Sequence, residues 1–470
     1  MHARRTKIVA TLGPATDGPG MLDQLIAAGM DCARINCSHG THDELRRRAI
    51  ELRAAADRAG RPVTLLFDLQ GPKIRLAADT VERRLEPGDR VVFCGNGDVS
   101  DPDAVRVAFD DFCGLVTDRS EIVIGDGVPR LMTESVSEDR VVARALSPGA
   151  LLPNKGINVT YARPTLPAIT EKDMADLDVA VEMGADFVAL SFVRNGIDMI
   201  RLVDLLEERR SHARVIAKIE KIEAYEHLDD ILAASHGVMV ARGDYGVEAG
   251  FARVPLMQKD TIYRATQAGK LVITATQMFE SMITQPEPTR AEAGDVANAV
   301  IDGTSAVMLS AETSIGAYPV QAVLAMSDIA MVAEESSVIR GGHEPDVGGT
   351  AAAVMHAAVT LADDVDAVAL IVPTTSGGTA RACAKYRRRR PIIALAHDHR
   401  VANQLALEWG VRAATIEYLD TVDDLVDAAL ECARDLADLS PGGLAVLTAG
   451  PQSGSIGATN LIVLRQIPGR

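Results

Sequence analysis

Residues 214–244, RVIAKIEKIEAYEHLDDILAASHGVMVARGD, place two strand-like runs on either side of a segment long enough for a helix. The runs RVIAKIE and GVMVARGD are rich in β-branched and other apolar residues, which is typical of parallel strands buried on both faces. Each run ends in a cation followed by a carboxylate, Lys218 with Glu220 and Arg242 with Asp244. The stretch therefore predicts a βα unit of a parallel sheet with charged side chains at its strand ends.

Six further runs of the same kind are spread along the chain, so eight parallel strands are expected. Eight βα units make up a (β/α)₈ barrel of roughly 250 residues, although a doubly wound sheet remains an alternative. The eight runs are KIVAT (7–11), DCARIN (31–36), VTLLFD (63–68), DFVALS (186–191), RVIAKIE (214–220), GVMVARGD (237–244), LVITAT (271–276) and AVMLSAE (306–312).

Residues 76–155 differ in character, with short strand-like runs separated by Pro, Gly and Asp turns. They predict a small β-barrel domain inserted into the (β/α)₈ barrel, and the (β/α)₈ barrel would then occupy residues 1–75 and 156–340. The segment GGHEPDVGG at 341–349 has the composition of a linker. Beyond it, residues 350–470 alternate again between strands and helices, which predicts an open α/β domain.

The overall composition is that of an acidic globular protein. The 470 residues include 48 Lys and Arg against 65 Asp and Glu, a formal charge of −17, which argues against nucleic acid or anionic membranes as partners. No apolar stretch is long enough to span a membrane and no signal peptide is evident, so a cytoplasmic location is expected. The six cysteines lack a zinc-ligand spacing and are expected to be reduced.

The carboxyl ends of barrel strands share one mouth, where barrel enzymes carry out their chemistry. Glu220 and Asp244 end neighbouring predicted strands, and Mg²⁺ prefers a carboxylate pair with open water positions. Ion pairs with Lys218 or Arg242 are an equally good structural explanation. The polar residues at the eight strand ends are Thr11, Arg34, Asn36, Ser38, Asp68, Ser191, Lys218, Glu220, Arg242, Asp244, Thr276, Ser310 and Glu312.

Five cations are expected around this carboxylate pair: Arg34, Lys73, Arg75, Lys218 and Arg242. Cations together with Mg²⁺ are what a transferring phosphoryl group requires, so a phosphorylated small acid is the favoured ligand. The chain has no G-x-x-x-x-G-K-[ST] loop, so a nucleotide would not be held in the P-loop manner.

A series of long motifs runs through nearly the whole chain: TKIVATLGPAT, AGMDCARINCSHG, FDLQGPKIR, NKGINVT followed by LPAITEKD, DFVALSFVR, IAKIEKIEA, VMVARGDYGVE, and ATQMFESMITQPEPTRAEAGDVANAVIDGTSAVMLSAET. In content and order these motifs resemble those of the pyruvate kinase family. The resemblance implies a phosphotransferase that moves the phosphoryl group of phosphoenolpyruvate to ADP in glycolysis. The products would be ATP and, after an enolate is protonated at carbon, pyruvate.

Motif positions within the resemblance imply roles for the mouth residues. Lys218 would neutralise charge on the transferring phosphoryl group, and Arg34 would contact the phosphate. Glu220 and Asp244 would hold Mg²⁺, or Mn²⁺ in its place. The backbone N–H groups of Gly243 and Asp244, at a helix start, would receive the substrate carboxylate.

The resemblance also places Thr276 over the face of the enolate, in the proton path. A hydroxyl is too weak an acid to be the sole proton source, so a relay through water, Ser310 and Glu312 is expected. The catalytic set is then Arg34, Lys218, Thr276, Ser310 and Glu312.

Four residues match nucleotide-contacting positions of the family: Asn36, His39, Arg75 and Lys155. Because Lys155 lies on the return from the inserted domain, that domain is expected to act as a lid. The segment NVTY at 158–161 replaces a common hinge sequence, which leaves lid closure less tightly specified.

A monovalent-cation site would lie against Asn36, Ser38, Asp68 and the Leu69 carbonyl, by motif position. Members that require K⁺ carry a Glu where this chain has Lys73, and the pattern here resembles the K⁺-independent branch of the family. We therefore expect that K⁺ is not required and that the Lys73 ammonium substitutes for it. The alternative is that Lys73 points to solvent and the retained ligands still bind K⁺.

Other departures from the family pattern remove no catalytic group. Cys37 replaces an aromatic residue, Tyr245 a Leu and Ala311 a Gly. Ile315 stands where a Lys is frequent and Glu44 where an aromatic faces the nucleotide, and both departures concern the strength of ADP binding.

In the carboxyl-terminal region, TTSGGTAR (374–381) opens a helix directly after a strand, so hydroxyls and N–H groups converge where a phosphate could bind. From the residues alone a plain turn with a helix cap is the better explanation, whereas the resemblance implies an effector pocket for a sugar phosphate or a nucleoside monophosphate. A homotetramer is also implied. For Arg387 to Arg390, a solvated helix end is favoured over an effector or subunit contact. The expected effector residues are Thr374, Thr375, Ser376, Gly377, Gly378 and Thr379.

Two functions other than a kinase are compatible with this type of barrel or its ligands. A Mg²⁺-dependent enolate lyase could use the same type of barrel, but the inserted lid with Arg75 and Lys155 argues against it. A non-catalytic sensor of phosphoenolpyruvate or a sugar phosphate is opposed by the joint presence of Lys218, Glu220 and Thr276, together with Asp244.

Overall fold

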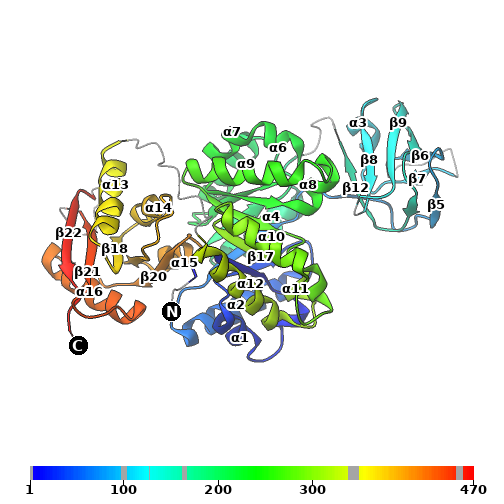
Figure 1. Ribbon diagram of the computed structural model, residues 1–470. Coiled ribbons are helices and arrows are strands. Elements are labelled where there is room, and N and C mark those ends of the chain that lie inside the picture. Colours follow the sequence, from blue (N-terminus) through cyan, green and yellow to red (C-terminus); the bar gives the residue numbers. More distant parts are fainter. Residues whose placement is uncertain are drawn as a thin grey trace.

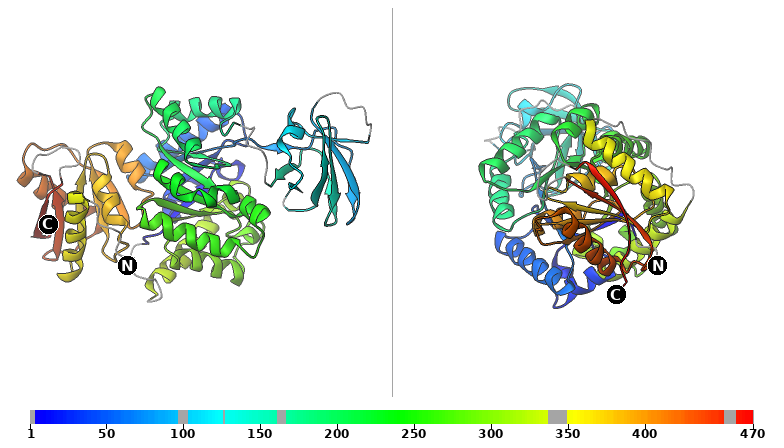
Figure 2. Two further views of the ribbon diagram at one scale, coloured as in Figure 1. Left: turned by 90° about the horizontal axis from the view of Figure 1, so that it is seen from above. Right: turned by 90° about the vertical axis from the view of Figure 1, so that its left-hand side faces the viewer.

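Three parts of the chain lie in a row (Figure 1). A helix-wrapped barrel stands in the middle, the inserted β domain projects from one side, and the carboxyl-terminal domain lies on the opposite side (Figure 2). Of the expected linker at 341–349, all but Gly349 lies outside the described residues. The computed structural model describes residues 4–96, 103–125, 127–160, 167–336, 349–450 and 459–469.

Eight parallel strands close the central barrel in the spatial order β1-β17-β16-β15-β14-β13-β3-β2. They are the eight apolar runs expected from the sequence, so the (β/α)₈ barrel is confirmed and the doubly wound sheet is wrong. Their bounds are β1 Lys7–Thr11, β2 Cys32–Asn36, β3 Thr64–Leu69, β13 Phe187–Leu190, β14 Arg214–Ile219, β15 Gly237–Ala241, β16 Leu271–Ala275 and β17 Ala306–Leu309.

Helices surround these strands, and several of them begin with a reciprocal cap. The Thr41 side chain accepts the Glu44 N–H at the start of α2, and Thr170 and Asp173 make the same pair at α4. Glu44 therefore serves the start of α2. The outer helices are α1 Met21–Ala28, α2 His42–Ala59, α4 Glu171–Glu182, α5 Gly196–Glu208, α6 Ile222–Glu226, α7 Leu228–Ala234, α8 Arg242–Ala249, α9 Val254–Gln267, α10 Arg290–Ile301, α11 Ala311–Ser314 and α12 Pro319–Glu335, with short 3₁₀ turns at Pro14–Thr16 and Glu280–Ile283.

The inserted domain is a sheet of order β4-β12-β8-β9-β10-β6-β7 around its own core, which includes Phe93 and Phe112. A bridge between Leu76 and Val107 brings the two ends of the sheet together, so that it curls into the expected small barrel. Beside it β5 pairs with β11. The elements are β4 Ile74–Arg75, β5 Arg83–Leu85, β6 Arg90–Cys94, β7 Val105–Arg106, α3 Phe112–Leu115, β8 Glu121–Ile124, β9 Arg130–Val136, β10 Val141–Ala145, β11 Gly149–Leu151 and β12 Gly156–Val159.

The carboxyl-terminal domain is an open sheet of order β20-β19-β18-β21-β22, in which only β22 runs antiparallel to its neighbour among the described strands. Helices cover both of its faces, as the sequence predicts. No helix in the described part of the chain has the length and apolar character that a membrane crossing needs. The elements are α13 Gly349–Asp364, β18 Ala369–Thr374, α14 Gly378–Ala384, β19 Ile392–Ala396, α15 His399–Leu405, β20 Val411–Thr415, α16 Val422–Ala437, β21 Leu444–Ala449 and β22 Leu461–Gln466.

This domain docks on the amino-terminal ends of the barrel strands, away from the mouth. Thr64 Oγ1, at the start of β3, donates a hydrogen bond of 2.6 Å to the Asn403 carbonyl of α15. Lys7 Nζ, at the start of β1, donates one of 2.6 Å to the Val411 carbonyl. The carboxyl-terminal domain and the inserted domain therefore occupy opposite ends of the barrel.

Arg387 takes part in this docking. Its guanidinium lies over the Trp409 ring, 4.8 Å from the centroid, and its Nη2 donates to Ser305 Oγ of the barrel at 2.8 Å. Burial lowers the pKa of Arg387 to about 10. The prediction of a solvated helix end is therefore wrong for Arg387, although Arg389 of the same run is exposed.

We expect Arg387→Glu to lower the free energy of unfolding by about 3 kcal/mol or more, because a buried carboxylate there would face Glu334 and Glu408 and lose its bond to Ser305. Urea denaturation followed by circular dichroism measures the change. The matched control Arg389→Glu, at an exposed position of the same run, should stay within about 0.5 kcal/mol of the parent protein. Equal effects of the two substitutions would contradict the docking role of Arg387.

Candidate active site at the barrel mouth

A cluster of buried charges joins three neighbouring strands at the mouth. Lys218 Nζ donates to Ser191 Oγ at 2.7 Å and lies 3.0 Å from Glu220 Oε1 and 3.3 Å from Asp68 Oδ1. Ser191 Oγ in turn donates to the Leu69 carbonyl at 2.7 Å. The ends of β3, β13 and β14 are therefore tied to one ammonium group.

The pKa values in the cluster reflect competition between burial and charge. Burial alone would lower the pKa of Lys218, but the negative charges of Asp68 and Glu220 outweigh it and raise that pKa. For Asp68, Lys218 and Arg34 overcome the effect of burial and lower the pKa. The pKa of Glu220 is raised, first by burial and then by repulsion from Asp244, against the attraction of Lys218. A cation bound between Glu220 and Asp244 would reduce the repulsion between these two carboxylates.

Arg34 belongs to the same network. Its Nε donates to Asp68 Oδ2 at 2.8 Å and its Nη1 donates to Thr11 Oγ1 at 3.0 Å. Thr11 Oγ1 donates to the Leu309 carbonyl at 2.8 Å. The guanidinium is thereby locked across β1, β2, β3 and β17, in the mouth where the sequence places it.

Thr276 and the start of α8 meet beside these charges. α8 begins at Arg242, so Gly243 and Asp244 lie in its first turn, as expected. The Gly243 N–H donates to Thr276 Oγ1 at 2.9 Å, and Thr276 Oγ1 donates to the Ala275 carbonyl at 2.7 Å. The Asp244 residue is exposed. The structure therefore brings Gly243, Asp244 and Thr276 to one rim of the mouth.

Arg242 does not join the cations of the mouth, which corrects that expectation. Its Nη1 pairs with Asp295 at 2.6 Å, and its Nη2 donates to the carbonyls of Thr276 and Gln277 at 2.7 and 3.0 Å. Thr276 and Gln277 have φ values of +63° and +55°, which are unusual for residues with side chains. Arg242 thus secures the backbone turn that presents Thr276. Of the two structural ion pairs considered, the one between Lys218 and Glu220 is present.

Ser310 and Glu312 lie at the end of β17. Glu312 accepts hydrogen bonds from the backbone N–H groups of Phe279 at 3.0 Å and Ser310 at 2.6 Å. The Ser310 hydroxyl is buried and has no partner among the described residues. None of the hydrogen bonds of the described residues joins Thr276 to Ser310 or Glu312, so a proton relay between them would need water.

A cavity of about 660 Å³ separates the inserted domain from the barrel. Lys73, Arg75 and Lys155 line it from the side of the inserted domain, and Asp244 lines it from the mouth. Arg75 Nη1 donates to the Asn154 carbonyl at 3.1 Å, which fixes Arg75 beside the returning strand. Two of the four expected nucleotide residues, Arg75 and Lys155, therefore share this cavity with Lys73.

The last residue of β2, Asn36, and the loop after it, with His39, carry the other two, outside the lining of that cavity. Asn36 Oδ1 accepts the Ser38 N–H at 3.1 Å. Burial lowers the pKa of His39, and the nearby charges of Lys73 and Arg75 lower it further. His39 therefore faces the same cations as the cavity and favours its neutral form.

Nothing in the sequence singles out Phe192, yet its backbone holds Glu220 in place. The Phe192 N–H donates to Glu220 Oε2 at 2.7 Å, and φ of Phe192 is +55°. A backbone N–H is the same in every residue except proline, so only the motif DFVALSFVR could have pointed to this position.

The loop before α14 is held by its own hydroxyls. The Gly377 N–H donates to Thr374 Oγ1 at 3.0 Å, and Thr379 Oγ1 lies 3.0 Å from Thr459 Oγ1. Arg381 Nη1 donates to the Ser376 carbonyl at 2.8 Å. The expected effector residues thus form one ordered turn.

A (β/α)₈ barrel with a cationic mouth, an inserted β domain and a carboxyl-terminal α/β domain defines a class of multidomain barrel enzyme. Comparisons with known proteins then give the family. The family model for the pyruvate kinase barrel domain matches residues 3–323, and that for the pyruvate kinase alpha/beta domain matches residues 352–464.

Similar proteins cover nearly the whole chain. The pyruvate kinase of Geobacillus stearothermophilus is 40% identical over 99% of this chain and 80% of its own length, and that of Bacillus licheniformis is 39% identical over 98% and 80%. The crystal structure of a pyruvate kinase from Cryptosporidium parvum superimposes with a TM-score of 0.91 at 32% identity, covering 99% of this chain and 96% of the other. The chain belongs to the pyruvate kinase family. It is a phosphotransferase whose substrates are phosphoenolpyruvate and ADP, in a family that requires a divalent metal.

Proposed function

We propose that the barrel mouth transfers the phosphoryl group of phosphoenolpyruvate to ADP with Mg²⁺ held by Glu220 and Asp244, and with Mn²⁺ able to substitute. The observation that carries this proposal is the placement of two carboxylates at the mouth: Glu220 is held by Lys218 and by the Phe192 N–H, and Asp244 lines the cavity under the inserted domain. Burial raises the pKa of Glu220, and the nearby charge of Asp244 raises it further. Two carboxylates would leave the remaining positions of an octahedral ion to water and substrate oxygens. When bound, the ion would act as a Lewis acid on the substrate oxygens.

The side chains around this pair bind and orient the substrate. Lys218, fixed by Asp68 and Ser191, presents a positive charge to the transferring phosphoryl group, and Arg34 contacts the phosphate. The Gly243 and Asp244 N–H groups at the start of α8 receive the substrate carboxylate, for which the Gly243 N–H exchanges its present acceptor, Thr276 Oγ1.

Protonation of the enolate involves Thr276, which lies on the rim beside Gly243. The proton is relayed to Thr276 through water, the buried hydroxyl of Ser310 and the Glu312 carboxyl group, so that no hydroxyl is its only source. Asn36, His39, Arg75 and Lys155 contact the nucleotide. This last set is supported by the cations that line the cavity under the inserted domain.

Lys218→Met should lower kcat by about 100-fold or more, about 3 kcal/mol, with a smaller change in the KM for phosphoenolpyruvate, because its charge is aimed at the transition state. A lactate-dehydrogenase-coupled assay with phosphoenolpyruvate, ADP and Mg²⁺ measures both constants. Lys259→Met, which removes an ion pair with Asp302 on the barrel exterior, serves as the control. Near-normal turnover of the Lys218 variant would remove Lys218 from the mechanism.

The enzyme does not require K⁺, we further propose, because this chain occupies the oxygens that would bind it. Asp68 is engaged by Arg34 and Lys218, and the Leu69 carbonyl accepts a hydrogen bond from Ser191. Lys73, an exposed residue that lines the cavity under the inserted domain, would supply a built-in cation near His39, whose pKa it helps to lower. A K⁺ ion placed 4 Å from that ammonium would meet a repulsion of about 4 kcal/mol at an effective dielectric near 20.

In tetramethylammonium buffer free of K⁺, activity should therefore be close to its full value. Adding KCl at constant ionic strength should change kcat less than about tenfold, which corresponds to about 1.4 kcal/mol. A larger stimulation would show that K⁺ still binds and that Lys73 does not replace it. NaCl at the same concentration controls for a general salt effect.

The carboxyl-terminal domain, residues 350–470, is proposed to regulate a cytoplasmic homotetramer by binding a sugar phosphate or a nucleoside monophosphate. The loop Thr374–Thr379 contributes the phosphate ligands, and Arg381 connects it to the barrel. Arg381 contacts the Ser376 carbonyl and Gln404 Oε1, and Gln404 Nε2 donates to the His212 carbonyl at 2.9 Å. His212 lies two residues before β14, the strand that carries Lys218.

Replacing Thr374, Ser376 and Thr379 by Ala should abolish activation by such an effector at sub-saturating phosphoenolpyruvate and leave activity at saturating substrate intact. Glucose 6-phosphate and AMP are suitable probes for the two classes of effector. Titrations of the initial rate against each probe, for the parent and the triple variant, measure the response. An unchanged response in the variant would place the effector site elsewhere.

A further inference from the structure

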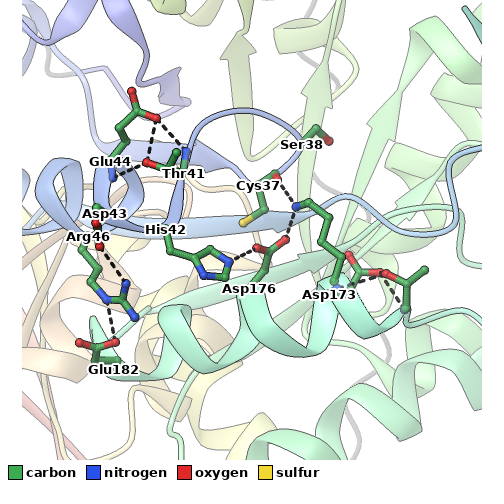
Figure 3. A network of polar contacts seen from close by, with 12 residues as sticks. Cys37, Ser38, Thr41, His42, Asp43, Glu44, Arg46, Asp173, Asp176 and Glu182 are labelled. Atoms are coloured by element: carbon green, nitrogen blue, oxygen red, sulfur yellow. Dashed lines mark hydrogen bonds and ion pairs between the residues drawn. The ribbon is translucent and has the colours of Figure 1, made fainter. Parts of the chain in front are cut away.

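The first turns of α4 hold the loop that follows β2 (Figure 3). Lys172 Nζ donates to the Cys37 carbonyl at 2.6 Å and lies 2.7 Å from Asp176 Oδ2. Asp176 Oδ1 lies 2.9 Å from His42 Nε2, at the first residue of α2. Lys172 and Asp176 of α4 therefore contact the two ends of the segment 37–42.

This arrangement is anchored at a buried charge. The Asp176 side chain is 1% exposed, whereas that of Lys172 is 49% exposed. A buried carboxylate needs paired donors, and Lys172 and His42 supply them. The ammonium of Lys172 is therefore held where it reaches the Cys37 carbonyl, and its bond to that carbonyl is charge-assisted.

The orientation of the Cys37 carbonyl determines the orientation of the residues next to it in the loop. It lies between Asn36 and Ser38, whose side chain and backbone are joined by a hydrogen bond of 3.1 Å, and His39 follows directly. Rotating the Cys37 peptide would move Ser38 and His39 together.

The same helix turn also fixes the loop after β3. Asp173 Oδ1 accepts the Gly71 N–H at 3.0 Å. Gly71 has φ +67°, and a Cβ there would lie 3.0 Å from the Ser191 carbonyl, so this backbone has little room to shift. Lys73 follows in that loop, and Arg75 lies on β4 directly after it. The start of α4 therefore sets the distance between the two loops that carry the proposed nucleotide residues.

General helix packing does not account for the contact with Cys37. α2 and α4 are joined independently by the pair Arg46 and Glu182, whose Nε and Oε2 atoms are 2.9 Å apart. That pair links the same two helices without touching the loop, as Figure 3 shows.

We propose that Lys172 and Asp176 are positioning residues for nucleotide binding: through the Cys37 carbonyl they hold Asn36 and His39 in the orientation that ADP requires. The inference rests on the proposed nucleotide role of Asn36 and His39. It assigns Lys172 no contact with either substrate.

The test compares Lys172→Met and Lys172→Arg with the control Glu182→Gln, which cuts the other pair between the same helices. Lys172→Met should raise the KM for ADP at least fivefold and change the KM for phosphoenolpyruvate less than twofold. Lys172→Arg, which keeps a cationic donor, should recover most of the affinity for ADP. Glu182→Gln should leave both constants unchanged.

Two outcomes would overturn the proposal: an unchanged KM for ADP in folded Lys172→Met, or an equal rise in both KM values. Circular dichroism and the melting temperature establish folding, and Asp176→Asn, which should mimic Lys172→Met more weakly, provides a second variant. His39→Ala distinguishes the positioning role of Lys172 from the proposed nucleotide role of Asn36 and His39, on which it rests. If His39→Ala raises the KM for ADP and Lys172→Met does not, only the positioning role fails; if His39→Ala has no effect, the nucleotide role of the loop fails.

Discussion

A single buried carboxylate, Asp68, holds the barrel mouth together because two cations from different strands share it. Arg34 reaches it from β2 and Lys218 from β14, while the Asp68 side chain is only 1% exposed. Such a charge remains ionised inside a protein only when partners surround it. Because Asp68 keeps the pKa of Lys218 raised, the ammonium remains a fixed positive charge at neutral pH.

The sequence predicted the barrel well because its signal is local. Each strand is a short run of β-branched residues, and the polar residue that ends the run reaches the mouth because of strand direction alone. The sequence did not predict the direction in which each side chain points at these strand ends. Lys218 with Glu220 and Arg242 with Asp244 share one spacing, yet Lys218 faces its carboxylate and Arg242 turns to Asp295 and the Thr276 carbonyl. What distinguishes them is the neighbouring turn, whose carbonyls accept hydrogen bonds from Arg242.

Contacts between distant segments could not be foreseen at all. Lys172 and the carbonyl that it binds are 135 residues apart, and TEKD was recognisable only as a motif. Arg387, within a run of four arginines, is indistinguishable in sequence from its exposed neighbour Arg389. What separates them is the Trp409 ring and the Ser305 hydroxyl, which the fold supplies from elsewhere. The parts of the site that depend on backbone groups and on docking surfaces therefore had to come from the structure.

Trp409 gives the protein an optical property that none of its catalytic residues possesses. It is the single tryptophan of the chain, and the guanidinium groups of Arg387 and Arg5 lie 4.8 Å and 5.6 Å from the centroid of its ring, where the carboxyl-terminal domain meets the barrel. The wavelength of indole fluorescence depends on the charge and hydration around the ring. All tryptophan fluorescence of this protein therefore comes from the interface between the carboxyl-terminal domain and the barrel. A separation of the two domains at this interface would therefore shift the wavelength of maximum emission, with no need for a dye, a label or an added tryptophan.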